Sequence, residues 1–157
     1  MWKKATAILA TALVLGIGAC DDDDPTGTDE TFAATLGPEG SVQTSATGTA
    51  TFELDGGIVS YVITVSDITD VTAAHIHGPA GASANAGVIV PLFAAPSGGT
   101  GNVDGQLVAS TFTAADITAS AVSMDSLLVL MRNGQSYVNV HTAVNPGGEI
   151  RGQITEQ

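Results

Sequence analysis

The chain has 157 residues, and its four lysines and arginines face sixteen aspartates and glutamates, a formal net charge of −12. Nucleic acid binding is excluded by this balance because such binding depends on neutralising phosphates with basic side chains, and attraction to anionic lipid headgroups is disfavoured for the same reason. The single cysteine excludes an intramolecular disulfide, so the fold must be stabilised by its own core.

The N-terminus has the organisation of an export signal. Lys3 and Lys4 precede an apolar run over residues 5–18 that is too short to span a bilayer comfortably, and small residues follow it up to Cys20. This spacing resembles a bacterial lipobox, in which the cysteine is lipidated and becomes the new N-terminus. We therefore predict a signal peptide over residues 1–19, lipid attachment at Cys20 and an exported protein held at the cell envelope by its lipid. The alternative is a secreted protein with an unpaired thiol.

The next segment, residues 20–30, contains four consecutive aspartates and no hydrophobic residue after Cys20. Such a composition cannot form a core, and its like charges keep it extended, so it predicts a flexible tether. Without residues 1–19, only Arg132 and Arg151 remain as cations against the sixteen acids, a formal charge of −14. The remaining region, 31–157, has the size of a single domain.

Short segments rich in Val, Ile, Thr and Ala recur through this region, separated by Gly, Pro, Asn or Ser. The pattern predicts an all-β fold, an antiparallel Greek-key-like β-sandwich of about seven or eight strands. Two capping signals, at Thr113 and Ser123, predict one or two short helices, the second of which ends at Asn133-Gly134. The predicted strands are 31–36, 46–54, 58–66, 70–77, 87–93, 104–112, 136–142 and 149–155.

All three histidines of the chain lie on strands in which polar and apolar residues alternate. Since successive side chains of a strand point to opposite faces, His75 and His77 share one face. The last two strands each carry a similar polar row, and we predict that they form a hairpin about Pro146-Gly147-Gly148, with both glycines setting the turn. The expected opposed pairs are His141 with Glu149, Asn139 with Arg151, and Tyr137 with Gln153.

Two interpretations of these polar rows remain open. In the first, the histidines are structural, and Glu149 orients His141 or stabilises its charge. In the second, His75, His77 and His141 bind one copper(II) or zinc ion, both of which favour imidazole nitrogen, with Asn139, Glu149 and Arg151 around them. The sequence contains no Gly-x-Ser-x-Gly motif and no glycine-rich loop leading into a phosphate-binding helix, so we predict no catalytic residue.

The residues of these polar rows and their flanks resemble a known family. HIHGPA at residues 75–80, then YVNVHT at 137–142 and NPGGEIRGQI at 145–154, resemble the CHRD domain, which is named after chordin and also occurs in bacterial exported proteins. Residues 32–36 and 47–52 fit its usual order, so the resemblance covers about residues 31–155. The family has no generally established biochemical activity. The resemblance therefore implies a non-catalytic binding or structural module whose protein or small-molecule partner is unknown.

A weaker resemblance, at the level of the fold, is to copper–zinc superoxide dismutase, a β-sandwich with a His-x-His strand and a late histidine. It would make His75, His77 and His141 copper ligands and Arg151 a guide for an anion, giving a copper-binding redox protein as the alternative function. The chain departs from that pattern because it has no bridging histidine, no zinc-binding cluster between residues 78 and 110 and no cysteine pair. Dismutase activity is therefore not expected.

Overall fold

The computed structural model describes residues 30–157 of the chain. The predicted signal peptide, Cys20 and nearly all of the predicted tether lie outside the described residues. The first strand begins at Glu30, the residue at which the predicted tether ends.

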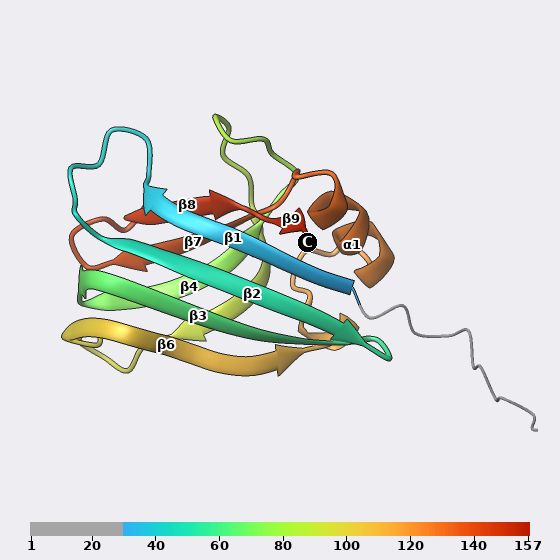
Figure 1. The fold of residues 1–157 in the computed structure, drawn as a ribbon, viewed down its shortest axis with the longest axis horizontal. Coiled ribbons are helices and arrows are strands. Elements are labelled where there is room, and N and C mark those ends of the chain that lie inside the picture. Colours follow the sequence, from blue (N-terminus) through green and yellow to red (C-terminus); the bar gives the residue numbers. More distant parts are fainter. Residues whose placement is uncertain (1–29) are drawn as a thin grey trace, which may run out of the picture.

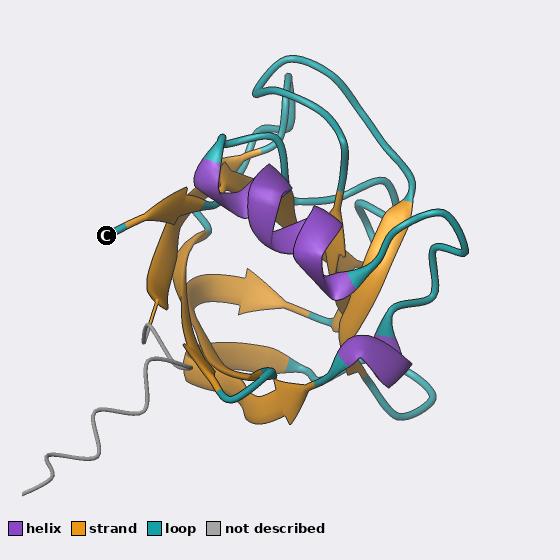
Figure 2. Ribbon diagram, turned by 90° about the vertical axis from the view of Figure 1, so that its right-hand side faces the viewer, coloured by secondary structure: helices purple, strands orange, loops and turns teal. Residues whose placement is uncertain are grey.

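Nine strands form one continuous sheet in which all neighbours are antiparallel, in the order β5-β4-β7-β8-β1-β2-β3-β6, with β9 added beside β1. The sheet curls until its two end strands, β5 and β6, contact each other. Figure 2 shows the strands around a common interior. The strands are β1 Glu30–Pro38, β2 Thr47–Asp55, β3 Ile58–Thr69, β4 Val71–His77, β5 Val88–Ala94, β6 Asn102–Phe112, β7 Tyr137–Thr142, β8 Ile150–Gln153 and β9 Thr155–Glu156.

The predicted fold class, antiparallel all-β, is confirmed. Strand β3 illustrates why the sequence could predict it: Val59, Tyr61, Ile63 and Val65 are buried, while the residues between them are exposed. Each alternating strand turns one apolar row into the same interior, and burial of that row stabilises the fold. The two walls of the predicted sandwich are parts of one sheet, with β1, β2, β3 and β6 on the near side of Figure 1 and β4 behind them.

Two short helices cover one end of this sheet (Figures 1 and 2). The 3₁₀-helix η1 spans Ala114–Asp116 and begins at a capping box formed by Thr113 and Asp116. Helix α1 spans Met124–Arg132, with Ser123 as its N-cap and Leu127, Leu128 and Met131 buried. Both predicted N-caps therefore begin a helix. Among residues 30–157, no helix is both long and apolar enough to span a lipid bilayer.

The register of three neighbouring strands positions the polar rows. Between β7 and β8, Asn139 pairs with Arg151 and Tyr137 with Gln153, as predicted. On the other side of β7, β4 places His75 beside Asn139 and His77 beside Tyr137. The β4–β7 pairing joins residues 60 to 71 positions apart in the chain and brings the two histidine-bearing strands into contact.

Candidate metal centre

The three histidines gather in one cluster on β4 and β7. The ring centroids of His75 and His141 are 5.0 Å apart, those of His75 and His77 5.6 Å, and those of His77 and His141 5.7 Å. One ligand nitrogen from each ring lies within 4.8 Å of the other two. His77 is buried, with 7% of its surface exposed, whereas His75 and His141 are partly exposed. Solvent can therefore reach the cluster through the latter two rings.

Backbone carbonyls fix which nitrogen of two rings carries the proton. Nδ1 of His77 lies 3.0 Å from the Ala86 carbonyl oxygen, and Nδ1 of His141 lies 3.0 Å from that of Pro146. A carbonyl oxygen only accepts hydrogen bonds, so each Nδ1 must donate, and Nε2 of each neutral ring carries a lone pair and no proton. Nε2 of His77 is buried and has no hydrogen-bond partner in the described part of the chain.

The His75 ring is hydrogen-bonded to the His141 ring. Nδ1 of His75 lies 3.1 Å from Nε2 of His141, and because neutral His141 carries its proton on Nδ1, the Nδ1–H of His75 donates to this Nε2. Imidazole nitrogens bound to one copper or zinc ion at about 2.0 Å lie about 3–4 Å apart. The His75–His141 pair already has this spacing, and one ligand nitrogen of His77 lies within 4.8 Å of both.

The surroundings keep two of the rings neutral. Burial, followed by the proximity of His141 and His77, lowers the pKa of His75 from 6.5 to about 4. Burial is also the main cause that lowers the pKa of His77, against the opposing effect of its bond to Ala86. A metal ligand must be deprotonated, so at neutral pH these two imidazoles are in the form that binds metal ions.

The predicted contact between Glu149 and His141 is not formed, and this expectation is corrected. The Glu149 carboxylate accepts hydrogen bonds from Thr44 at 2.7 Å, Thr142 at 2.7 Å and Asn145 at 3.0 Å. Burial raises the pKa of Glu149, but these three bonds together outweigh it, and the pKa lies below its ordinary value. Glu149 therefore fixes the turn that carries Pro146, and it reaches His141 only through that turn.

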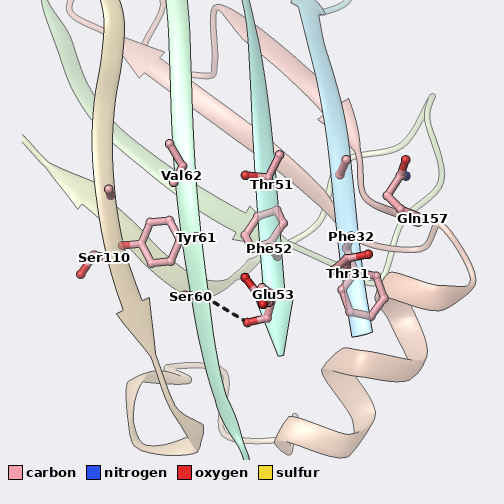
Figure 3. A pocket seen from close by; sticks show the side chains of 12 residues that line it. Thr31, Phe32, Thr51, Phe52, Glu53, Ser60, Tyr61, Val62, Ser110 and Gln157 are labelled. Atoms are coloured by element: carbon pink, nitrogen blue, oxygen red, sulfur yellow. Dashed lines mark hydrogen bonds between the residues drawn. The ribbon is translucent and has the colours of Figure 1, made fainter. Parts of the chain in front are cut away.

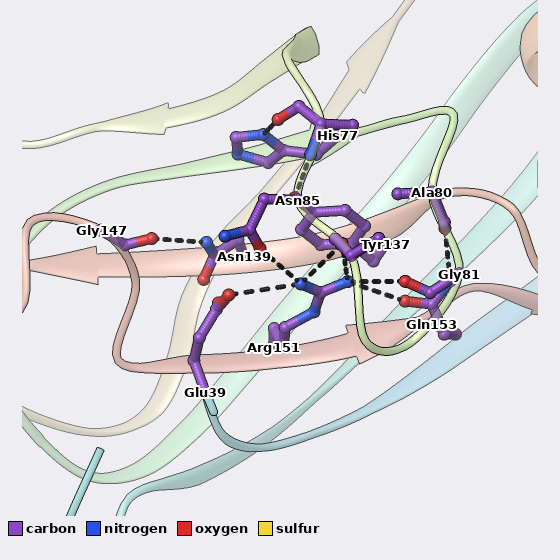
Figure 4. Close-up of polar contacts among 12 residues, drawn as sticks. Glu39, His77, Ala80, Gly81, Asn85, Tyr137, Asn139, Gly147, Arg151 and Gln153 are labelled. Atoms are coloured by element: carbon purple, nitrogen blue, oxygen red, sulfur yellow. Dashed lines mark hydrogen bonds and ion pairs between the residues drawn. The ribbon is translucent and has the colours of Figure 1, made fainter. Parts of the chain in front are cut away.

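Arg151 is the centre of a polar network beside the cluster (Figure 4). Its side chain is 10% exposed, and its terminal nitrogens contact Glu39 at 3.2 Å and the loop between β4 and β5, residues 78–87. Its guanidinium carbon also lies 3.5 Å from the centre of the Tyr137 ring. This enclosed arrangement does not fit the predicted role of an anion guide, because such a role needs donors that face solvent.

Asn139 pairs with Arg151 on β8, as the sequence predicted, and with His75 on β4, which the sequence did not predict. Its amide nitrogen donates to the Gly147 carbonyl at 3.0 Å, and its amide oxygen is buried without a hydrogen-bond partner in the described residues. Asn139 thus ties β7 to the turn that follows it.

Sequence reasoning missed three groups that support the cluster. They are the carbonyls of Ala86 and Pro146 and the ring of Tyr137, which stacks on His77 with centroids 5.1 Å apart and planes 9° from parallel. No sequence signal identifies the two carbonyls, since every residue has a backbone carbonyl. The alternation placed Tyr137 on the polar face, and this was the available hint that it neighbours His77.

A second feature of the surface is a shallow hollow on the outer faces of β1, β2 and β3 (Figure 3). Thr51, Ser60 and Val62 line it, and Glu53 is the one charged residue in its lining. None of its lining residues is a histidine or a member of the Arg151 network. The hollow therefore offers no metal-binding group beyond a single carboxylate.

Comparison with known proteins agrees with the motifs. The family model of the CHRD domain matches residues 26–154. No curated protein and no solved structure shows significant similarity to the chain. The matched region contains the histidine cluster, the Arg151 network and the whole sheet up to β8, and on this ground the chain belongs to the CHRD domain family.

Proposed function

We propose that this CHRD domain is a non-catalytic binding module of the cell envelope, exported and anchored by a lipid on Cys20, whose ligand is a divalent transition metal ion. Membership of the CHRD family supports a binding or structural module without catalysis. The N-terminal sequence supports export and anchoring, since a basic start, a short apolar run and small residues lead directly to the single cysteine.

The observation that carries the metal proposal is the convergence of His75, His77 and His141, with one ligand nitrogen of each within 4.8 Å of the others. A histidine buried for structural reasons normally has both ring nitrogens satisfied, because an unpaired buried polar atom costs free energy. Here Nε2 of His77 is buried and unpaired among the described residues, while its Nδ1 is bound. A metal ion on this nitrogen would supply the missing partner.

The ligand chemistry favours copper(II), with zinc as the close competitor. Three imidazoles form a nitrogen-only set, and at a given nitrogen site copper(II) binds more tightly than other divalent first-row metals. Hydrogen bonds from Nδ1 of His77 and His141 to carbonyls are the outer contacts that usually orient metal-bound histidines and increase their basicity. The role we assign is binding, because membership of the CHRD family supports a module without catalysis.

Titration calorimetry with copper(II) at neutral pH tests this proposal. The full chain is purified in detergent without a polyhistidine tag, because a tag would bind copper itself. We expect about one equivalent to bind saturably, and His75→Ala, His77→Ala and His141→Ala each to weaken binding strongly. Gln43→Ala, at an exposed position of the surface, is the matched control and should bind like the wild type.

The variant lacking all three histidines is also needed, because the aspartate-rich segment after Cys20 could attract copper weakly. Saturable binding in that variant equal to the wild type would assign the copper to the segment and contradict the proposal. Absence of saturable binding by the folded wild type would contradict it as well.

A further inference from the structure

The orientation of His77 depends on a loop that contributes no ligand of its own. The loop over residues 78–87 connects β4 to β5, and its Ala86 carbonyl accepts the Nδ1 proton of His77 at 3.0 Å. If this carbonyl moved away, the Nδ1 proton of His77 would lose its acceptor, and neither the ring orientation nor the tautomer that leaves a lone pair on Nε2 would be fixed. Whatever holds this loop on the sheet therefore also holds a ligand of the proposed metal site.

Arg151 holds the loop from the sheet side. Both of its terminal nitrogens lie 3.2 Å from the Ala84 carbonyl, one lies 3.1 Å from the Asn85 side chain, and the other 3.4 Å from the Gly81 carbonyl. On the other side, Glu39, directly after β1, at 3.2 Å and Gln153 of β8 at 3.1 Å bind the same guanidinium. Arg151 is therefore a main attachment of the end of the loop next to Ala86, while Ala80 at the other end donates to the Gln135 carbonyl at 2.8 Å and accepts from Gln153 at 3.0 Å.

Tyr137 makes a second connection between Arg151 and His77. Its hydroxyl accepts a hydrogen bond from the backbone N–H of Ala86 at 3.1 Å, next to the carbonyl that binds His77. Its ring stacks on His77 and also lies under the Arg151 guanidinium, whose carbon is 3.5 Å from the ring centre. Figure 4 shows Tyr137 between the His77 ring and the guanidinium. A cation over an aromatic ring favours this stacked order.

We propose that Arg151 is a positioning residue of the metal site, which holds His77 in its metal-binding orientation through Tyr137 and the 78–87 loop. This inference rests on the proposed metal binding. Arg151 forms no hydrogen bond to an imidazole and is not a ligand of the ion. Its effect is to keep the His77 nitrogen available beside those of His75 and His141; if the loop were released, only the latter two would bind the ion. Removal of such outer contacts typically costs 10–100-fold in metal affinity.

The test compares copper(II) binding by the full chain with that of Arg151→Met, which retains an apolar stem and loses every donor. We expect the dissociation constant to rise about 10–100-fold and the electron paramagnetic resonance spectrum to change from three coordinated nitrogens to two. Arg132→Met is the matched control, because Arg132 is the other arginine and its ion pair with Glu30 lies on the surface outside this network. It should leave both the affinity and the spectrum unchanged.

A double-mutant cycle separates positioning from a general loss of stability. If Arg151 acts through His77, Arg151→Met should cause no further loss of affinity in the His77→Ala background. Tyr137→Phe provides a milder second variant, since it keeps the stacked ring and removes only the hydroxyl that binds Ala86. It should lower copper affinity with the same change in the spectrum, and it decides the matter if circular dichroism shows that Arg151→Met does not fold.

The outcomes of this experiment distinguish the two proposals. A wild type without saturable copper binding overturns the proposed function and this inference with it. A wild type that binds copper through three nitrogens, with Tyr137→Phe and folded Arg151→Met showing the same affinity and spectrum, overturns the positioning role alone. An equal loss from Arg151→Met with and without His77 also contradicts that role.

Discussion

Gly148, in the turn between β7 and β8, has to be a glycine because of its backbone conformation and its contact with Asn139. Its φ is +128°, and a Cβ at this position would clash with the side-chain amide of Asn139. The same Asn139 amide donates to the carbonyl of Gly147, so it cannot easily move aside. The sequence predicts that both glycines set this turn, but a Cβ at Gly147 would meet no atom within 4 Å, and its φ is not positive. The conformational requirement therefore falls on Gly148 alone.

Gly148→Ala is expected to destabilise the protein by about 1–3 kcal/mol, the usual range for a residue forced into an unfavourable backbone conformation. The free energy of unfolding from urea titration measures this, with Gly147→Ala as the control that should change it little. Equal stability of the two variants would show that the turn tolerates a side chain at both positions.

The lowered pKa of His75 makes the stability of the folded protein depend on pH. Its pKa in the folded protein is about 4, below the value of 6.5 expected for the unfolded chain. Between pH 6.5 and 4 the unfolded chain therefore binds a proton that the folded chain does not, so stability falls as the pH drops through this window. The lowered pKa of His77 acts in the same direction.

We expect the urea midpoint of the metal-free protein to fall from pH 7 to pH 5, and to fall less in His75→Gln, which cannot take up that proton. Unfolding in the presence of a chelator at the two pH values measures the difference. An equally large fall in His75→Gln would contradict the assignment of this pH dependence to His75.

At the scale of the elements, local sequence signals were sufficient to locate the strands and helices. The alternation of apolar residues located the eight main strands, and the caps at Thr113 and Ser123 located both helices, because these features depend on residues close in sequence. The register of β7 and β8 was predictable for the same reason, since a short turn fixes which residues oppose each other.

Ser123→Ala tests one of these local signals. The Ser123 hydroxyl accepts a hydrogen bond from the backbone N–H of Ser126 and caps helix α1, so its loss should lower the free energy of unfolding by about 1 kcal/mol. Ser120→Ala, at an exposed position before the helix, is the matched control. An equal effect of both substitutions would remove Ser123 from the stabilising contacts of α1.

Contacts between elements far apart in the chain could not be predicted in the same way. The three histidines were identified as candidates from their faces, but nothing local indicates that β4 lies beside β7 or that the 78–87 loop folds back onto Arg151. The predicted contact between Glu149 and His141 was wrong because strand register determines where a residue lies but not which hydrogen bonds its side chain forms. Thr44, from the segment between β1 and β2, was the competitor that the register did not reveal.

At the scale of the whole molecule, one curled sheet supports one candidate site, and the described part of the chain contains no other cluster of three or more potential metal-binding side chains. The strong negative charge disfavours attraction of the protein surface to anionic lipid headgroups, so the proposed membrane association rests on the lipid alone. Strand β1 begins near helix α1 (Figure 1), and its first residue, Glu30, binds Arg132 at the end of that helix.

Cys20→Ala tests the anchor. The variant should appear in the soluble fraction after cell fractionation, because the lipid is the only membrane attachment that we propose. Ser41→Ala, an exposed substitution inside the domain, is the control and should remain with the membrane. A Cys20→Ala protein that stays in the membrane fraction after a high-salt wash would contradict lipid attachment at this residue.

The central claim is that His75, His77 and His141 form one metal site. Crystals of the full chain loaded with one equivalent of copper(II), measured on both sides of the copper absorption edge, test it most directly. The account predicts a single anomalous difference peak about 2 Å from Nδ1 of His75 and from Nε2 of His77 and His141, with the Ala86 and Pro146 carbonyls still bound to the other nitrogens. A peak elsewhere on the protein, or no peak between these three rings in crystals soaked with copper, would contradict it.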